Sequence, residues 1–458
     1  MPSKTLDDYI KQIQTTTKQI TKEKENTTKY RIIGFYKETQ FRETPIGKIP
    51  KEWEIVKLKD ITYKIKAGGT PKVSKREFWN GDIPFVKIED LTSSGKYLYS
   101  VKTFITEQGL RNSSAWLVPR DSLLIAMYGS MGEVAINKIK VTTNQAILGI
   151  IPKEKVLVEY LYYWFLYFKP KWRIYAKWTT QPNLTAEIIR NIHLPFPPIE
   201  EQRGIVEVLS SVDRAIEETS RLLEKLERIK RALLQELLTK GIGHREFKET
   251  PIGKIPKKWK VVNLGNIGSF QYGITTPARS ENTGIKLLRI TDIDIKNGRI
   301  NWDDMPYCRI SERDFKRYKL NIGDILFARI GATTGKTCYV NRDEPAVFGS
   351  YLIRFIPSTK EINMKYLYYF TQSTQYWVQV NKLKGGQLKK GLNTKLLARI
   401  KIPLPQLEEQ RRIVNILSSV DEWIMREIKR KKKLKRLKKG LMDILLTGKV
   451  RIRVARVG

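Results

Sequence analysis

The sequence predicts an α+β protein with an internal pseudo-twofold repeat: two similar insert domains separated by an antiparallel coiled-coil pair of long helices. The segment FRETPIGKIPKEWEIVKL at 41–58 returns as FKETPIGKIPKKWKVVNL at 247–264. A second segment, LPFPPIEEQRGIVEVLSSVDRAI at 194–216, returns as IPLPQLEEQRRIVNILSSVDEWI at 402–424. Solenoid repeats recur every 20–50 residues or so, whereas this spacing is about 206 residues. A whole domain-plus-helix unit is therefore duplicated, and we call the repeated segments the frame.

The frame divides the chain into five segments. Residues 1–40 are polar and rich in Thr and Lys, and we expect a leader that is part helix and part loosely ordered. We expect the first insert domain at 41–197, the first long helix at 198–246, the second insert domain at 247–405, and the second long helix with its tail at 406–458. Because this order with a quasi-dyad makes the helices antiparallel, the leader is expected to lie near the C-terminus.

Each insert domain contains short apolar runs bounded by Gly, Pro or Asn, a pattern typical of strands. In the first domain we expect strands at 83–91, 122–128, 133–136 and 146–151, and helices at 160–168 and 185–190. In the second domain we expect strands at 287–293, 324–330, 337–340 and 351–356, followed by a Tyr-rich helix. The letters YLYY occur in the predicted helices of both domains. Strands combined with segregated helices predict an α+β domain.

Prolines followed by paired acids (Glu200-Glu201 and Glu408-Glu409) mark the start of both long helices. Apolar residues then recur at a 3-4 spacing and form a predicted seam: Ile205, Leu209, Val212, Ile216, Leu223 and Leu226 in the first helix, and Ile413, Leu417, Val420, Ile424, Leu434 and Leu441 in the second. This period predicts coiled-coil pairing. The alternative is that each helix packs only on its own insert domain. Further apolar residues beside the seam leave a second face for another partner: Leu222, Ile229, Ile416, Trp423 and Ile428.

The charge of the chain points to a polyanionic partner. Lys and Arg total 85 against 47 acidic residues, which gives a formal net charge of +38. Such an excess suits nucleic acid. The alternative, a ribosome-associated or generally adhesive basic protein, fits less well with 10% aromatic residues. The basic run at 426–439, with ten Lys or Arg and one Glu, is either a DNA contact or an exposed helix face.

Cysteines, histidines and apolar runs exclude several other classes. Cys308 and Cys338 have no neighbouring ligand cluster, and His193 and His244 have no metal-ligand spacing, so we expect no metal site. The N-terminal residues lack the apolar stretch of a signal peptide. The most apolar run, YLYYWFLYF at 160–168, is too short to span a bilayer. We therefore expect a cytoplasmic protein without a membrane partner.

Enzyme motifs fail on spacing, so we predict no catalytic residues. GATTGKT at 331–337 has three residues between its glycines, whereas a P-loop needs four. Nuclease-like D-x-K triples at 294–296 and 314–316 lack an evident partner acid, and such triples arise by chance in a chain with 29% charged residues. A methyltransferase would need a glycine-rich cofactor loop and a tetrapeptide of the NPPY kind, and neither is present. A DNA-reading adaptor and a stand-alone site-specific endonuclease remain as the two hypotheses.

Several motifs together resemble one family. They are GKIPKEW at 47–53, GGTP at 68–71, TTQPNL at 179–184, the P-x-x-EQ-x-x-IV-x-x-L starts of both long helices, and LLTGK at 445–449. In this order, and duplicated, they resemble the specificity subunit of a Type I restriction-modification system over residues 41–450. The second copy departs in two loops: GITTP at 273–277 replaces GGTP, and GGQLKKGLN at 385–393 replaces TTQPNL. We expect these loops to be placed differently in the second domain.

The resemblance implies two target-recognition domains, each reading one half of a bipartite, asymmetric site on double-stranded DNA. It also implies that the helices dock two modification (methyltransferase) subunits and, through them, a possible restriction subunit. No cofactor is expected in this chain, since S-adenosylmethionine, ATP and Mg²⁺ belong to the partner subunits. A helix of about 40 residues spans roughly 60 Å, enough to set two reading domains a DNA turn or more apart.

The residues expected to contact DNA are basic and polar groups in glycine-containing loops. Such groups pair with bases or hold phosphates; the alternative for each is a solvated surface side chain. In the first domain they are Lys66, Thr70, Lys72, Lys75, Arg76, Lys87, Thr179, Thr180 and Gln181. In the second domain they are Gln271, Tyr272, Thr275, Arg279, Arg289, Arg329, Thr333, Thr334, Lys336 and Gln387.

Overall fold

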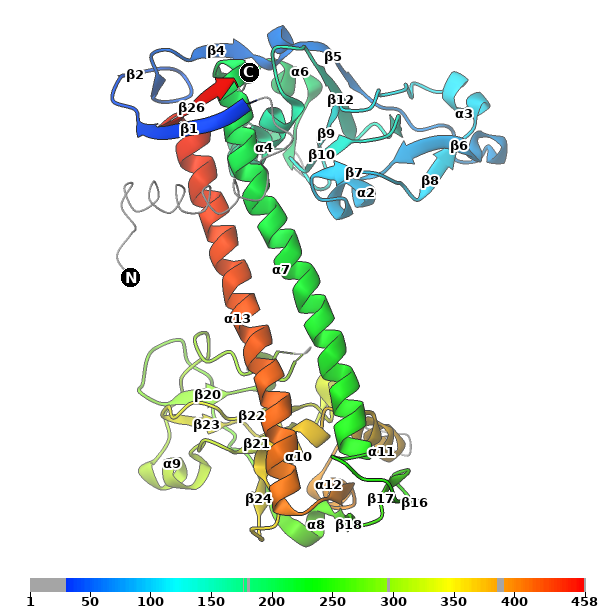
Figure 1. Ribbon diagram of the computed structural model, residues 1–458, viewed down its shortest axis with the longest axis vertical. Coiled ribbons are helices and arrows are strands. Elements are labelled where there is room, and N and C mark those ends of the chain that lie inside the picture. The colour runs from blue at the N-terminus through cyan, green and yellow to red at the C-terminus, as the bar shows by residue number, and fades with distance from the viewer. Residues whose placement is uncertain (1–29, 176, 179–181, 295–296, 385–390, 457–458) are drawn as a thin grey trace. The chain divides into compact units, whose positions relative to one another are not determined.

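The computed structural model describes residues 30–175, 177–178, 182–294, 297–384 and 391–456 (Figure 1). The chain forms two compact units: unit 1 comprises 1–220 with 430–458, and unit 2 comprises 221–429. The helices α7 (Ile199–Thr239) and α13 (Leu407–Leu446) each contribute one half to each unit. Each unit therefore contains one insert domain and one pair of helix halves.

The insert domain of unit 1 is built on a five-stranded sheet in the order β5-β12-β9-β10-β7. Its strands are β5 (Thr62–Ala67), β12 (Ile147–Pro152), β9 (Leu123–Ala126), β10 (Val134–Asn137) and β7 (Tyr97–Leu98). All neighbours are antiparallel except β7 and β10. The apolar helix α4 (Val158–Phe168) packs against β9 and β10. A second sheet joins β11 (Thr142–Thr143), β6 (Trp79–Val86) and β8 (Thr103–Ile105).

The insert domain of unit 2 repeats this plan with a four-stranded antiparallel sheet in the order β19-β24-β21-β22. Its strands are β19 (Gly268–Tyr272), β24 (Leu352–Pro357), β21 (Ile325–Ala328) and β22 (Thr337–Tyr339). Helix α10 (Met364–Phe370) contacts β22 and is followed by α11 (Thr374–Lys384). In both units a two-stranded antiparallel sheet joins the start of the insert domain to its end. These pairs are β4 (Glu54–Lys57) with β15 (His193–Phe196), and β18 (Lys260–Asn263) with β25 (Lys401–Leu404).

Most predicted strands and helices of the insert domains are confirmed, but two predicted strands end early. The run 83–91 leaves β6 at Val86 and becomes helix α2 (Ile88–Ser93), and the run 287–293 leaves β20 (Lys286–Leu288) for a 3₁₀ turn at 290–292. The reason is an aspartate in each run. Asp90 accepts a hydrogen bond from the Lys87 backbone N–H at 2.9 Å, and Asp292 accepts one from that of Arg289 at 2.8 Å. These bonds satisfy the first N–H of a helical turn and stop the strand.

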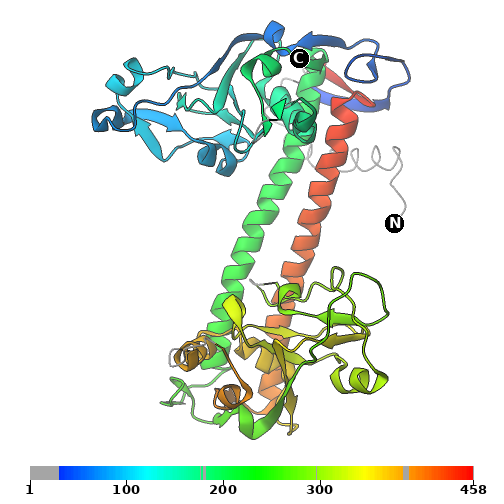
Figure 2. The same ribbon diagram turned by 180° about the vertical axis from the view of Figure 1, so that it is seen from behind.

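The predicted pairing of the long helices is confirmed within each unit, where the two helix halves lie side by side (Figure 2). In unit 1, Ile205, Leu209 and Val212 of α7 share one apolar cluster with Leu441 of α13 and with α4. In unit 2, Ile413 and Leu417 of α13 share a cluster with the end of α7 and with α10. The helices thus pack on each other and on their own insert domain at once. Of the other seam residues Leu226 and Ile424 are buried, while Ile216, Leu223, Val420 and Leu434 are half-buried.

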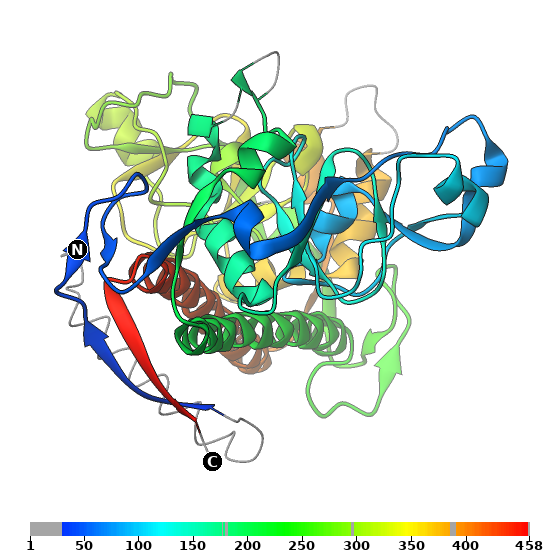
Figure 3. The same cartoon turned by 90° about the horizontal axis from the view of Figure 1, so that it is seen from above.

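The expectation of a helical or loosely ordered leader is wrong for its described part. Tyr30–Lys37 forms strand β1, which pairs antiparallel with β26 (Val450–Arg456) at the other end of the chain (Figure 3). The predicted proximity to the C-terminus is therefore confirmed. This two-stranded ribbon packs on α7 at Gly204, where a Cβ atom would lie 2.8 Å from Ile452 Cγ2. The matching position in α13 is Arg412, which is exposed.

Candidate nucleic-acid interface

The repeated frame segments make a corresponding set of hydrogen bonds and ion pairs in each unit, and we call these contacts anchors. The Trp53 indole N–H donates to Glu201 Oε2 at 2.9 Å, and the Trp259 indole N–H donates to Glu409 Oε2 at 2.9 Å. Both indoles are buried. The GKIPxxW segment that opens each insert domain is thus fastened to the first turn of the helix that follows that domain. This contact explains why the tryptophan and the glutamate recur together.

A second anchor is the glutamine that follows each of these glutamates. Gln202 accepts a hydrogen bond from the Leu157 backbone N–H at 3.0 Å and donates to Pro197 O at 2.9 Å. Gln410 accepts from the Asn363 backbone N–H at 2.8 Å and donates to Pro405 O. Both amides are fully buried, so each bond replaces water that the backbone group has lost. The EQ pair therefore holds the loop before α4 or α10 against the helix start.

The third anchor ties the two helix halves to each other and to the insert domain. In unit 1, Asp213 of α7 pairs with Lys438 Nζ of α13 at 2.6 Å and accepts the Tyr163 hydroxyl at 2.7 Å. Burial raises the pKa of Tyr163, which keeps its hydroxyl protonated as a donor. Lys96 Nζ adds a bond to Ser210 Oγ at 2.8 Å, and burial lowers the pKa of Lys96 to about 8.

Unit 2 contains the reciprocal arrangement. Asp421 of α13 pairs with Lys230 Nζ of α7 at 2.7 Å and accepts the Tyr369 hydroxyl at 2.8 Å. Each helix therefore gives one aspartate and one lysine, and each pair joins helix halves that run in opposite directions. A polar pair inside an apolar seam favours one register, because any slip leaves its charges unpaired.

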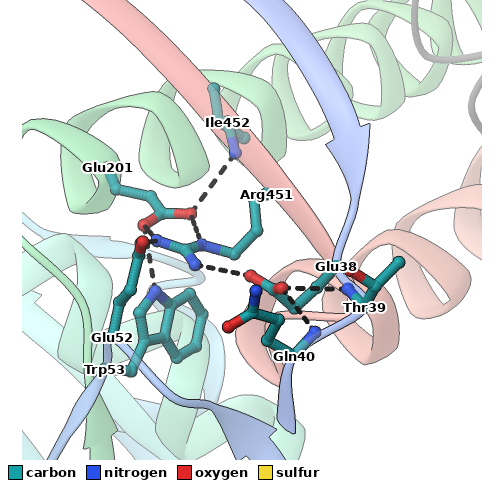
Figure 4. Close-up of polar contacts among 8 residues, drawn as sticks. All are labelled: Glu38, Thr39, Gln40, Glu52, Trp53, Glu201, Arg451 and Ile452. Carbon is teal, nitrogen blue, oxygen red and sulfur yellow. Dashed lines mark hydrogen bonds and ion pairs between the residues drawn. The ribbon is translucent and has the colours of Figure 1, made fainter.

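The glutamate that accepts the tryptophan N–H has different additional partners in the two units. In unit 1 the buried Arg451 of β26 donates to both oxygens of Glu201, at 2.7 and 2.9 Å (Figure 4). Arg451 also donates to Glu38 at 2.7 Å and to Glu52 at 3.1 Å. In unit 2 the matching Glu409 instead accepts from His244 Nε2 at 2.8 Å and from the Ile242 backbone N–H. One guanidinium thereby joins β26 to Glu38, which follows β1, and to the start of α7.

The loops that the frame displays differ between the units. In unit 1 a concave site of about 820 Å³ is lined by three of the predicted DNA-contacting residues, Thr70, Arg76 and Lys87. Asn144 also lines it, and sequence reasoning missed this residue, although it stands in a polar pair before a buried strand. Lys66, Lys72 and Lys75 are exposed outside this lining, and Lys75 pairs with Glu77. The predicted residues Thr179, Thr180 and Gln181 lie outside the described residues.

In unit 2 two of the predicted residues, Arg329 and Tyr272, are in contact. The Arg329 guanidinium lies 5.0 Å from the centre of the Tyr272 ring and donates to Ser350 O at 3.4 Å. Its Nε–H is buried and has no hydrogen-bond partner among the described residues. Thr275 and Arg279 are exposed nearby in sequence, and Thr333 and Lys336 are half-buried. Gln387 lies outside the described residues.

Three other predicted residues of unit 2 are engaged within their own domain. Gln271 accepts a hydrogen bond from Arg354 Nε at 3.1 Å, and Arg289 forms two bonds to Asp292 at 2.9 and 3.1 Å. Thr334 is buried, and its hydroxyl donates to Gly331 O at 2.7 Å. These hydrogen bonds stabilise the loop conformations. Such a side chain can contact DNA only if it gives up its hydrogen bond within the domain for one to DNA.

The GGTP loop and its longer counterpart begin alike and then diverge. Gly69 N donates to Thr143 O at 2.9 Å, and Ile274 N donates to Phe348 O at 2.9 Å, which are matching positions of the two domains. The additional residue of the second loop follows Ile274. The two loops are therefore placed alike up to Gly69 and Ile274, and the predicted difference in placement concerns only the residues after them.

The residues that the structure describes contain no group of three or more His, Cys, Asp or Glu side chains placed to hold a metal ion. Among the described helices, none combines the length and the apolar character needed to cross a membrane.

A duplicated frame that presents two divergent loop surfaces defines a two-domain recognition protein. The chain belongs to the family described as Type I restriction modification DNA specificity domain, whose model matches residues 50–228 and 256–438. It is 31% identical over 434 residues to the Type I restriction enzyme MjaVIII specificity subunit of Methanocaldococcus jannaschii, covering 92% of this chain and 98% of that protein. The putative MjaX specificity subunit of the same organism is 29% identical, covering 92% of this chain and 99% of that one.

A solved structure shares the fold. The S subunit of a Type I restriction-modification system from M. genitalium matches with a TM-score of 0.53 at 15% identity, covering 86% of this chain and 96% of that one. At this identity the match concerns the fold alone. It agrees with the arrangement of two insert domains and two paired long helices described above.

Proposed function

We propose that this chain is the DNA-specificity subunit of a Type I restriction-modification complex, in which each insert domain reads one half of a bipartite, asymmetric DNA site. The observation that carries this function is the contrast between the frame and the loops. Anchors such as Trp53–Glu201 and Trp259–Glu409 are the same in both units. Matching positions of the loops differ: GGTP at 68–71 corresponds to GITTP at 273–277, and Met127 corresponds to Arg329. Identical supports therefore present two different sets of base-reading groups. The net charge of +38 supports a polyanionic partner.

We further propose that the helices dock methyltransferase subunits, one for each copy of the frame, and a restriction subunit through them. The support is an apolar surface on the helix halves of unit 2. Ile229 and Trp423 are each 49% exposed, and Ile416 and Ile428 are also exposed. Four of the five residues that the sequence placed beside the seam are thus exposed, whereas Leu222 is half-buried. Exposed apolar side chains on a helix pair favour an interaction site. The chemistry of methylation and cleavage then belongs to the partners.

Exchange of one insert domain tests the two-reader proposal. Replacing 41–197 with the equivalent domain of a relative is expected to change one half of the selected DNA sequence and to leave the other half unchanged. The readout is selection of oligonucleotides from a random pool by the reconstituted complex. The matched control is Leu209→Ala with Leu417→Ala, which removes buried seam contacts and is expected to weaken folding or docking without altering base preference. A simultaneous change in both half-sites contradicts the proposal.

Incubation of the purified chain with Mg²⁺ and mixed DNA separates an adaptor from a stand-alone endonuclease. We expect neither cleavage nor methyl transfer by the chain alone. Methylation is expected once a methyltransferase partner and S-adenosylmethionine are added. Strand breaks produced by the pure chain, and retained through repurification, would overturn the adaptor proposal and favour the endonuclease.

A further inference from the structure

Unit 2 contains a basic pocket of about 460 Å³ between its insert domain and α13. Five Lys or Arg side chains line it against two acids, and they come from separate parts of the chain: Arg299, Arg342, Lys365, Arg426 and Lys429. Ser418 and the tyrosines Tyr368 and Tyr369 also line it. All these residues belong to 221–429. The pocket is therefore a feature of one compact unit.

The two acids of the pocket are already engaged. Asp421 binds Lys230 and the Tyr369 hydroxyl, and Glu422 lies 3.6 Å from Arg426 on the same helix. Arg299, Lys365 and Lys429, by contrast, have no carboxylate within ion-pair distance among the described residues. Among the described residues, the pocket thus carries more positive charge than the carboxylates around it neutralise. Concentrated positive charge of this kind attracts an anion.

Unit 1 provides a matched comparison, because the frame fixes which residues correspond. Tyr160 and Tyr366 make the same bond to a proline carbonyl, so Lys365 corresponds to Glu159. Asp213 and Asp421 hold the same lysine and tyrosine partners, so Arg426 corresponds to Glu218. Two positions that are acidic in unit 1 are therefore basic in unit 2.

The interior of the site also differs. In unit 1 the Lys96 ammonium donates to Ser210 Oγ at 2.8 Å and lies 3.2 Å from the Tyr163 hydroxyl. The corresponding hydroxyls in unit 2, Ser418 and Tyr369, line the cavity instead. Unit 1 therefore fills this position with the Lys96 side chain, whereas in the described part of unit 2 the matching hydroxyls border a cavity.

We propose that this pocket of unit 2 binds a phosphate group. Arginine guanidinium groups match the tetrahedral oxygens of phosphate with paired N–H donors, and lysines supply further charge. A phosphate offers more acceptor oxygens and more charge than one carboxylate, which suits three cations that form no ion pair within the described part of the chain. The phosphate is either a free ion or nucleotide, or a backbone phosphate of DNA. The DNA source rests on the proposed function, and the free ligand does not.

The test uses the full chain and a variant that restores the residues of unit 1, Lys365→Glu with Arg426→Glu. Because unit 1 folds with Glu159 and Glu218 in these places, the frame tolerates the change. The matched control, Lys258→Glu with Lys260→Glu, makes the same change of charge at exposed positions of unit 2, outside the pocket lining and outside the basic run at 426–439; unit 1 has Glu52 and Glu54 at these positions. Circular dichroism and thermal unfolding establish that all three proteins are folded.

The first arm measures binding of pyrophosphate by calorimetry. The second arm measures binding of a random-sequence duplex across a salt series. Affinity for the phosphate source is expected to fall about tenfold or more in the pocket variant and less than about threefold in the control. For DNA, the slope of log K against log salt is expected to decrease by about 1 for each lost phosphate contact. A loss in the pyrophosphate arm identifies a free phosphate ligand, and a loss in the DNA arm alone identifies a backbone phosphate.

Equal effects of pocket and control variants in both arms, or no effect of either, would overturn the proposal. Displacement of pyrophosphate by polyglutamate at equal charge concentration would also overturn it, since the pocket would then select charge rather than phosphate. Neither arm requires the recognised sequence. Failure here therefore leaves sequence-specific reading untouched, and failure of the domain-exchange experiment leaves the phosphate pocket untouched.

Discussion

Lengthening the gap between the two half-sites by one base pair is expected to lower the affinity of specific binding tenfold or more. The helices α7 and α13 are continuous over 41 and 40 residues, and each contributes to both units. Their register is held by Asp213–Lys438 in unit 1 and by Asp421–Lys230 in unit 2. We therefore expect the two reading surfaces to keep one spacing.

One added base pair moves a half-site by about 3.4 Å and rotates it by roughly 35°. Hydrogen bonds tolerate only a few tenths of an ångström, so one domain loses its contacts or the DNA twists to fit. Losing two bidentate base contacts costs about 2–6 kcal/mol in total, at about 1–3 kcal/mol each. The measurement is a binding series with the gap changed by one pair at fixed half-sites, and base changes inside the gap serve as the control. Equal affinity across the series would mean that the domains are flexibly tethered.

The second large effect is a loss of stability, expected when Asp213 of unit 1 is replaced by alanine. Asp213→Ala leaves the Lys438 ammonium and the Tyr163 hydroxyl without their acceptor in a site where the Asp213 side chain is only 18% exposed. Removing one partner of a buried ion pair costs about 3–5 kcal/mol, and partial exposure reduces this to about 2–3 kcal/mol. The measurement is urea unfolding followed by circular dichroism and tryptophan fluorescence.

Two variants sharpen this experiment. Glu217→Ala, an exposed position one turn along α7, is expected to change the free energy of unfolding by less than about 0.5 kcal/mol. Asp213→Leu with Lys438→Leu removes both charges of the pair and is expected to recover part of the loss, because Lys438 is no longer left as a charge without its partner. If Asp213→Ala unfolds at the same urea concentration as the wild type, the ion pair does not stabilise the helix register.

The frame could be predicted from sequence because its partners recur together. Trp53 with Glu201 and Trp259 with Glu409 repeat as whole motifs, so duplication exposed them before any contact was known. The helix seam followed from periodicity alone. Strand β1 was missed because its partner, β26, lies at the opposite end of the chain and neither segment repeats. Arg451 was missed for a related reason: a basic residue in a basic tail gives no sign of burial.

The candidate interface was predictable only in outline. Glycine-containing loops made Arg76 and Arg329 candidates for DNA contact, but they did not indicate which polar side chains are already engaged by their own domain. The bond between Gln271 and Arg354 joins neighbouring strands, and that between Arg289 and Asp292 closes a turn. Both depend on side-chain directions that a sequence pattern does not fix. The basic pocket of unit 2 was invisible for the same reason, because its lining residues are scattered from 298 to 429.

The ribbon of β1 and β26 has a consequence for the order in which the protein is made. Unit 2 is one uninterrupted stretch, 221–429, whereas unit 1 combines 1–220 with the last 29 residues, 430–458. Domains fold as units during synthesis from the N-terminus. Unit 2 is therefore complete on the ribosome before unit 1, although unit 1 begins first. Until Arg451 emerges, Glu38, Glu52 and Glu201 have no guanidinium to bind, so a nascent chain that stops a few residues short leaves its first domain unfinished and its second one whole.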